Sequence, residues 1–347
     1  MSAQLLMKFV YPRLFIPLLC VSLLAPACSE SEPAQQQPER STQDGPLPQL
    51  TDASASAAED VGRDAQGSTP APSPRESCGG GTTAVSRRLE ELQVGDLLRR
   101  YRLSLPATEA GTQLPILFAF QGGDGGDSPF PQQERFNALV DEERFIMVSP
   151  IAALIPPNEG AWQLNTREGY TQDVDFIAAI IDGLSARYCV DPARIYATGY
   201  SLGSMFTYEL PCQLSERFAA IASFAGTMPL NPTACDPRAP VAIMHIHGQD
   251  DWLISYREQW DWKEWDTVGT MRDIPGLIDF WRETYRCQRS EEPPSASGLH
   301  TVHSGCDGEV RVELRALRSV EHEWPAQIDE RPTAALIWDF LKEFRRD

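Results

Sequence analysis

Five residues, Gly199-Tyr200-Ser201-Leu202-Gly203, constrain this chain most, because they join a predicted strand to a predicted helix. Residues 194–198 are rich in the aromatic and β-branched side chains typical of a buried strand, and residues 204–210 begin the helix. A serine on so sharp a turn projects out of the sheet, and the two glycines permit the turn because they have no Cβ. Its hydroxyl then lies at a helix N-terminus, where backbone N–H groups favour negative charge. This is the place for an acyl-transfer nucleophile, although Gly-x-Ser-x-Gly also arises by chance.

Strands and helices alternate along the rest of the chain. Continuous apolar runs or β-type patterns predict strands at 100–106, 115–120, 145–149, 219–224, 241–246 and 310–314. Helical spacing of apolar residues predicts helices at 173–188, 274–286 and 333–344. This alternation predicts an α/β fold, in which a mostly parallel sheet has helices on both faces. Ligands of such sheets bind beyond the carboxyl ends of the strands.

The first 28 residues have the pattern of an export signal. Lys8 and Arg13 precede an apolar run at 14–25 that is too short to span a bilayer. Small residues follow, and Cys28 stands where a bacterial lipoprotein cleavage box has its lipidated cysteine. We therefore expect export with lipidation at Cys28, or plain secretion as the alternative.

Composition separates a linker from a folded domain. Residues 29–77 are rich in Ser, Ala, Pro, Gln, Asp and Glu, and they are predicted to be a disordered linker because they can bury little apolar surface. One folded domain is expected at 78–347. The 347-residue chain has 49 acidic and 30 basic residues, a net charge of -19. Such a charge repels nucleic acid and anionic membranes, so neither is an expected partner, apart from a lipid anchor.

Six cysteines follow the signal segment, and an even number in an exported chain predicts disulfides. Proximity along the sequence favours the pairs Cys212–Cys235 and Cys287–Cys306, which leaves Cys78–Cys189. Six cysteines allow fifteen connectivities, so other pairings stay open. The sequence has no Cys-x-x-Cys pair, and we predict neither a metal nor an organic cofactor.

A catalytic serine needs a histidine to accept its proton and a carboxylate to orient that histidine. In α/β-hydrolases the carboxylate and then the histidine follow the serine in the chain. Of the five histidines, His322 follows a predicted strand and precedes the last predicted helix, so it is the expected base for Ser201. Of the remaining four, His245 is predicted to be a structural residue within a strand, and His247 to lie at the end of that strand. His300 and His303 are predicted to lie in a solvated loop.

The carboxylate and the oxyanion hole have candidates in two further turns. Asp251 follows the strand at 241–246 and has the better spacing for the orienting acid, with Asp250 as the reserve candidate. The alternative is that both residues are solvated acids in a loop. Oxyanion donors must be backbone N–H groups placed where charge develops. We expect one from Leu202, directly after the nucleophile, and one from Gly123 in the glycine-rich turn after residue 120.

With these residues assembled, the chain from about residue 78 onward resembles the esterases grouped with secreted polyhydroxybutyrate depolymerases and feruloyl esterases. The resemblance rests on residues 101–106, the Gly122-Gly123 turn, residues 188–201, residues 218–222, His247-Gly248 with Asp251 and Tyr256, Trp281 with Cys287, and His322-x-Trp324-Pro325. It implies an α/β-hydrolase fold, Ser201, Asp251 and His322 as the catalytic triad, and Leu202 and Gly123 as oxyanion donors.

The chain departs from that family at three places. Gln121 replaces a usual histidine, and Leu202-Gly203-Ser204 replaces a usual Asn-Gly-Gly, which puts the substrate preference in doubt. Pro211 should kink or end the helix after the nucleophile near Leu210.

Tryptophans suggest how substrate is bound. Trp324, beside His322, is a candidate pocket wall, and Trp252 is a candidate for stacking on a sugar or phenolic ring. Trp252 begins a tryptophan-rich stretch with Trp260, Trp262 and Trp265, which can equally be the packed side of a surface helix.

The sequence therefore predicts an exported serine ester hydrolase that works through an acyl-enzyme on polyester or polysaccharide-linked acyl esters. Two alternatives are a serine peptidase on the same fold and a non-catalytic surface lipoprotein that binds glycan or polyester through its tryptophans.

Overall fold

The computed structural model describes residues 81–82, 84–123, 128–153, 162–166, 171–261 and 268–346. Residues Ser68–Asp347 form one compact unit, and the other unit, Met1–Gly67, lies outside the described residues. The predicted signal segment, the predicted linker, Cys28 and Cys78 therefore also lie outside them.

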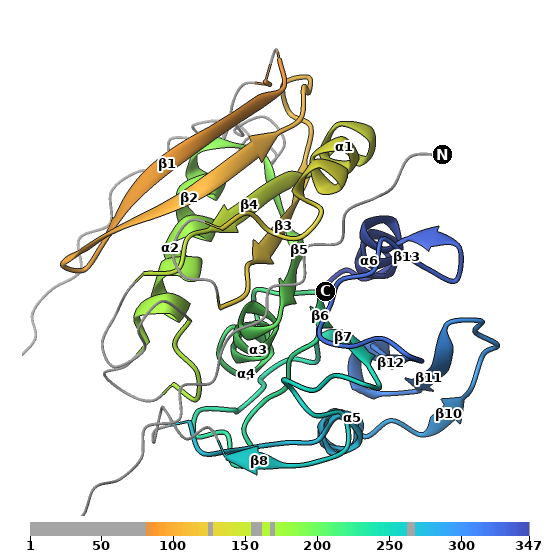
Figure 1. The fold of residues 1–347 in the computed structure, drawn as a ribbon. Coiled ribbons are helices and arrows are strands. Elements are labelled where there is room, and N and C mark those ends of the chain that lie inside the picture. The colour runs from red at the N-terminus through yellow and green to blue at the C-terminus, as the bar shows by residue number, and fades with distance from the viewer. Residues whose placement is uncertain are drawn as a thin grey trace, which may run out of the picture. The chain divides into compact units, whose positions relative to one another are not determined.

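A ten-stranded sheet crosses the domain in the order β1-β2-β4-β3-β5-β6-β7-β12-β11-β10 (Figure 1). Its strands are β1 (Ser86–Val94), β2 (Leu97–Leu105), β3 (Leu114–Phe120), β4 (Ile146–Pro150), β5 (Val190–Tyr200), β6 (Ala220–Phe224), β7 (Ala242–Gly248), β10 (Arg289–Glu291), β11 (Gly298–Ser304) and β12 (Val312–Leu317). The strands from β4 to β12 in this order run parallel, and antiparallel strands flank them at both edges. The predicted α/β fold with a mostly parallel sheet is confirmed.

Helices cover both faces of this sheet. They are α1 (Gln133–Glu143), α2 (Gln172–Arg187), α3 (Leu202–Thr207), α4 (Glu209–Gln213), α5 (Ile274–Thr284) and α6 (Thr333–Leu341). Figure 1 shows α1 and α6 on one side of the sheet and α2, α3 and α4 on the other. Every residue of β3 and β7 is buried, because such strands have helices on both sides.

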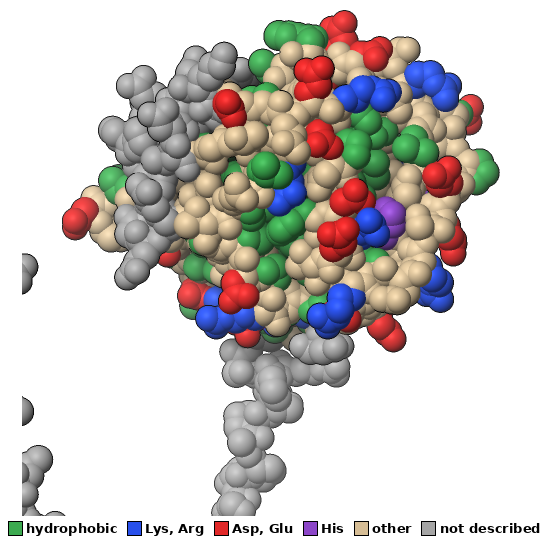
Figure 2. Space-filling model, turned by 90° about the horizontal axis from the view of Figure 1, so that it is seen from below, with side chains coloured by type: hydrophobic (Ala, Val, Ile, Leu, Met, Phe, Trp, Pro, Cys, Tyr) green, Lys and Arg blue, Asp and Glu red, His purple; other side chains and the backbone are tan. Residues whose placement is uncertain are grey.

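Short elements complete the described fold. They are the 3₁₀ helix η1 (Asp307–Glu309), the strand pair β8 (Trp260–Asp261) with β9 (Thr270–Met271), and the strand pair β13 (Gln327–Ile328) with β14 (Arg331–Pro332). No helix among the described residues is both long and apolar enough to cross a membrane. On the face shown in Figure 2, acidic and basic side chains are interspersed, so the acidic excess does not form a single patch there.

Strand β11, which lies between β12 and the edge strand β10, corrects the prediction that His300 and His303 lie in a solvated loop. Both residues belong to β11, and Nε2 of His300 lies 2.9 Å from Oε1 of Glu313 on β12. The segment is polar and has no continuous apolar run, because most residues of β11 are only half-buried. It pairs antiparallel with β12, the next strand in the chain.

The helix after the nucleophile is interrupted, as Pro211 predicts, but slightly earlier than expected. α3 ends at Thr207, and α4 contains Pro211. A proline ring crowds the carbonyl four residues before it, which here belongs to Thr207, and proline has no N–H to donate to that carbonyl. The break therefore falls at Tyr208 instead of Leu210.

Disulfides join the predicted cysteine pairs that the structure describes. Cys212 in α4 bonds to Cys235, and Cys287 after α5 bonds to Cys306. Cys189 is disulfide-bonded as well, whereas its predicted partner, Cys78, lies outside the described residues.

Candidate active site

Ser201 lies on a tight turn between β5 and α3. Its φ of 54° and ψ of -122° are unusual for a residue with a side chain, so the surrounding structure must hold this conformation. A Cβ at position 199 would lie 2.3 Å from the carbonyl oxygen of Gly203, and one at position 203 would lie 2.2 Å from that of Phe120. Both glycines are therefore required by close backbone contacts, in agreement with the prediction from the sequence.

Three of the predicted site residues meet at the carboxyl ends of β5, β7 and β12. Nε2 of His322 lies 2.8 Å from Oγ of Ser201, and Nδ1 of His322 lies 2.8 Å from Oδ2 of Asp251. Asp250, the reserve candidate, is exposed and is not one of the hydrogen-bonded partners of His322. In neutral imidazole, Nδ1–H donates to the carboxylate and Nε2 accepts the serine proton, which is the arrangement that nucleophilic catalysis needs.

Asp251 is buried and fully surrounded by donors. Its Oδ1 accepts the backbone N–H groups of Leu253 at 2.9 Å and Ile254 at 2.8 Å. Its Oδ2 lies 3.3 Å from Nε2 of His247 in addition to its contact with His322. Burial alone would raise the pKa of Asp251, but hydrogen bonds from His247, His322 and Ile254 hold it well below its usual range. Asp251 is therefore a carboxylate at neutral pH.

The glycine turn after β3 lies against the nucleophile. A Cβ at Gly122 would be 3.2 Å from Cβ of Ser201, and one at Gly123 would be 3.6 Å from Cδ2 of Leu202. The two segments predicted to supply oxyanion donors are therefore neighbours. Within the described residues, no group of three or more His, Cys, Asp or Glu side chains is placed to hold a metal ion.

The tryptophans near the site differ in their surroundings. Trp324 is half-buried and stacks on Phe224 with ring centroids 4.5 Å apart, so it is part of the packed wall next to His322. Trp252 is 74% exposed, in a segment of turns and not on a helix. Trp260 lies in β8, so the surface-helix interpretation is wrong for both described tryptophans of this stretch. Trp262 and Trp265 lie outside the described residues.

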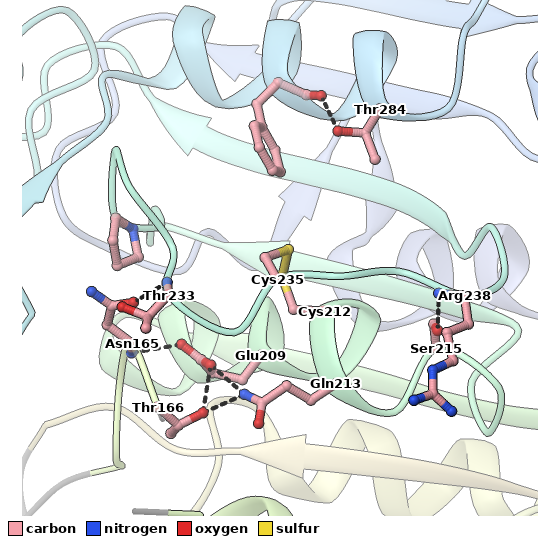
Figure 3. Close-up of a disulfide and its surroundings, with 12 residues drawn as sticks. Asn165, Thr166, Glu209, Cys212, Gln213, Ser215, Thr233, Cys235, Arg238 and Thr284 are labelled. Atoms are coloured by element: carbon pink, nitrogen blue, oxygen red, sulfur yellow. Dashed lines mark hydrogen bonds between the residues drawn. A yellow bond between two sulfur atoms is a disulfide. The ribbon is translucent and has the colours of Figure 1, made fainter. Parts of the chain in front are cut away.

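A buried carboxylate behind this site fixes a neighbouring loop (Figure 3). Glu209 in α4 accepts the backbone N–H of Asn165 at 2.7 Å, the hydroxyl of Thr166 at 3.1 Å and the amide of Gln213 at 2.7 Å. The same loop contains Trp162, whose indole N–H donates to the carbonyl of Gln121 at 3.0 Å, just before the glycine turn. Glu209 thus anchors the loop that supports the predicted oxyanion segment.

The substitution Glu209→Gln is expected to lower the free energy of unfolding by about 1–3 kcal/mol. Asn165, Thr166 and Gln213 all donate hydrogen bonds to the Glu209 carboxylate. In the glutamine variant, an NH₂ group replaces one of the two carboxylate oxygens and faces these donors, so neither it nor they have an acceptor there. Chemical denaturation measures the change. Glu216→Gln is the matched control, because Glu216 is exposed and its ion pair with Arg238, at 3.7 Å, lies on the surface. Equal stability of the two variants would contradict the anchoring role of Glu209.

A mostly parallel sheet with a serine on a strand-to-helix turn, and with a histidine and a carboxylate at later strand ends, defines the class of α/β-hydrolases. Residues 163–266 match the family model described as phospholipase/carboxylesterase.

Relatives and a solved structure agree with this class. The chain is 25% identical over 242 residues to the bifunctional acetylxylan esterase/xylanase XynS20E of Neocallimastix patriciarum, over 67% of this chain and 31% of the relative. It is 25% identical over 191 residues to feruloyl esterase B of Piromyces equi, over 54% of this chain and 34% of the relative. The chain thus spans about a third of the length of these relatives. The acetyl xylan esterase from Aspergillus awamori has the same fold, with a TM-score of 0.53, 15% identity, and coverage of 74% of this chain and 99% of that one.

The chain therefore has an α/β-hydrolase fold, and it is similar to proteins described as carboxylesterases, acetylxylan esterases and feruloyl esterases. The resemblance to feruloyl esterases predicted from the sequence is confirmed by these comparisons. The polyhydroxybutyrate depolymerase part of that resemblance stays a prediction.

Proposed function

We propose that this protein is an exported serine esterase that hydrolyses acyl esters carried on polysaccharide, of the feruloyl or acetyl type, through an acyl-enzyme. Polyester oligomers are the second substrate class. The observation that carries the proposal is the pair of 2.8 Å contacts that links Ser201 through His322 to Asp251.

Acylation uses these groups in order. Oγ of Ser201 attacks the ester carbonyl carbon while Nε2 of His322 accepts its proton, and a C–O bond to the serine forms. The N–H groups of Leu202 and Gly123 stabilise the oxyanion. Asp251 holds the imidazole in the required tautomer and stabilises its cation. The bond to the leaving alcohol then breaks, and His322 protonates that alcohol, which leaves an acyl-serine.

Deacylation repeats the sequence with water. His322 accepts a proton from water, whose oxygen attacks the acyl carbon, and the bond to Ser201 breaks as the serine regains its proton. The products are the free acid and the enzyme. In both steps of this proposal, the catalytic groups are side chains and backbone N–H groups of this chain.

Export is supported by the disulfides that the domain contains, because such bonds persist in oxidising compartments. The proposed route is the signal segment at 1–28, with lipidation at Cys28 and the linker at 29–77 as a tether, or secretion without the lipid. Mass spectrometry of the mature N-terminus distinguishes the two forms.

A substrate panel tests the function. We expect the purified protein to hydrolyse methyl ferulate or acetylated xylan, with a hydroxybutyrate oligomer and peptide anilides assayed beside them. A fluorophosphonate probe is expected to label Ser201, as read by peptide mass spectrometry. Cleavage of peptide anilides alone would make the protein a peptidase. Absence of both turnover and labelling would leave the binding-protein alternative.

A further inference from the structure

Three polar side chains form a buried chain behind Asp251. His245 and His247 are two residues apart in β7 and project from the same face, and Tyr208 lies between α3 and α4. The hydroxyl of Tyr208 is 2.7 Å from Nδ1 of His245, and Nε2 of His245 is 3.1 Å from Nδ1 of His247. The two histidines are 0% exposed and Tyr208 is 1% exposed, so water does not satisfy them. We call these three residues the histidine chain.

The partners of the histidine chain fix the position of each proton. Nε2 of His247 faces two acceptors, the carbonyl of Ile254 at 2.9 Å and Oδ2 of Asp251 at 3.3 Å, so it must carry the hydrogen. Nδ1 of His247 is then an acceptor, and Nε2 of His245 must donate to it. Nδ1 of His245 in turn accepts the hydroxyl proton of Tyr208. Each donor points toward Asp251, and no member lacks a partner.

Burial keeps His245 and Tyr208 uncharged. Desolvation, together with the neighbouring His247, lowers the pKa of His245 well below its ordinary value. Burial also raises the pKa of Tyr208 and of Tyr256, whose ring lies 6.1 Å from that of His247. Asp251 contacts Nε2 of His247 and, on its other side, Nδ1 of His322. Neutral His245 can therefore donate to Nδ1 of His247, which leaves the hydrogen of His247 on Nε2, facing Asp251.

We propose that His247, held in its tautomer by His245 and Tyr208, is a positioning residue that orients Asp251 and shares its charge with His322. This inference rests on the proposed function. Oδ1 of Asp251 is held by two backbone N–H groups, but Oδ2 has His247 as its second donor beside His322. Without that donor, the carboxylate of Asp251 would rotate more freely. Its Oδ2 would also interact more strongly with the imidazolium form of His322, because its negative charge would no longer be shared with a second donor.

Two substitutions of the same residue separate these effects. The amide of His247→Asn reaches the place of Nδ1, so it keeps the contact with His245 and loses the donor to Asp251. The amide of His247→Gln reaches the place of Nε2, so it keeps that donor and loses the contact with His245. We expect kcat/KM to fall about 10–100-fold in the Asn variant and much less in the Gln variant. The acid limb of kcat/KM should move to higher pH by about one unit in the Asn variant only.

Equal losses in the two variants, or an acid limb that stays in place or moves to lower pH in His247→Asn, would overturn the proposal. A second measurement does not depend on activity. In histidine-labelled protein at neutral pH, ¹⁵N NMR is expected to show His245 as a neutral Nε2–H tautomer and His247 with its hydrogen on Nε2. An Nδ1–H tautomer at either histidine would also overturn the positioning role of His247. A failure of the proposed function itself would be distinguishable, because esterase activity would then survive the loss of Ser201.

Discussion

Replacement of Ser201 by alanine is expected to lower kcat by about 10⁴- to 10⁶-fold and to leave the fold intact. The substitution removes the nucleophilic oxygen of the acylation step, which lies 2.8 Å from Nε2 of His322. Alanine keeps a Cβ, so the strained φ of 54° costs the same in both proteins. Steady-state kinetics on methyl ferulate or an activated acetyl ester measures kcat, and chemical denaturation measures stability. Residual activity would come from the oxyanion donors alone.

Ser319→Ala is a matched control for this experiment. Ser319 also has a positive φ, 56°, and its side chain is exposed, so alanine there tests the backbone effect without touching the proposed nucleophile. We expect its kcat to stay within about twofold of the wild type, because exposed substitutions usually change little. A Ser201→Ala variant that kept more than about one per cent of the wild-type kcat would place the nucleophile elsewhere.

The central fold was predictable because its signals are local. Strands β3 and β7 are buried on both faces, so they appear in the sequence as continuous apolar runs. The turn at Ser201 requires glycine at positions 199 and 203, where any Cβ would meet backbone atoms. These requirements concern residues that are close together in the sequence, so they locate the candidate nucleophile without knowledge of the rest of the structure.

Features without a continuous apolar pattern, or that depend on residues of other elements, are not predicted from the sequence. β1 at one edge of the sheet and β11, next to the edge strand β10, have exposed or half-buried residues, so their alternation is weak, and His300 is predicted in a loop. The contact of His247 with Asp251 was also missed. A signal existed, because His245 and His247 share a face of β7 and Asp251 follows four residues after His247. What the sequence does not contain is the position of the Ile254 carbonyl, which together with Asp251 fixes the direction of the hydrogen bonds.

Replacement of Asp251 by asparagine is expected to lower kcat by about 10⁴-fold, because it leaves His322 in the wrong tautomer. The backbone N–H groups of Leu253 and Ile254 require an acceptor, so they select the amide oxygen of the new side chain. The amide NH₂ then takes the place of Oδ2 and donates to Nδ1 of His322. Nε2 of His322 consequently carries a hydrogen toward Ser201 and cannot accept the serine proton.

The same substitution also affects stability in a pH-dependent way. The pKa of Asp251 is lowered in the folded protein, so its ionised form stabilises the fold above its ordinary pKa of about 4, and this contribution is lost as the pH falls further. Asp251→Asn should therefore be less stable than the wild type at pH 7, by a margin that shrinks in acid. Asp250→Asn is the matched control, since that carboxylate is exposed. If the Asp250 variant lost activity and the Asp251 variant kept it, the orienting acid would be Asp250, and the hydrogen bond between Asp251 and His322 would be a structural contact.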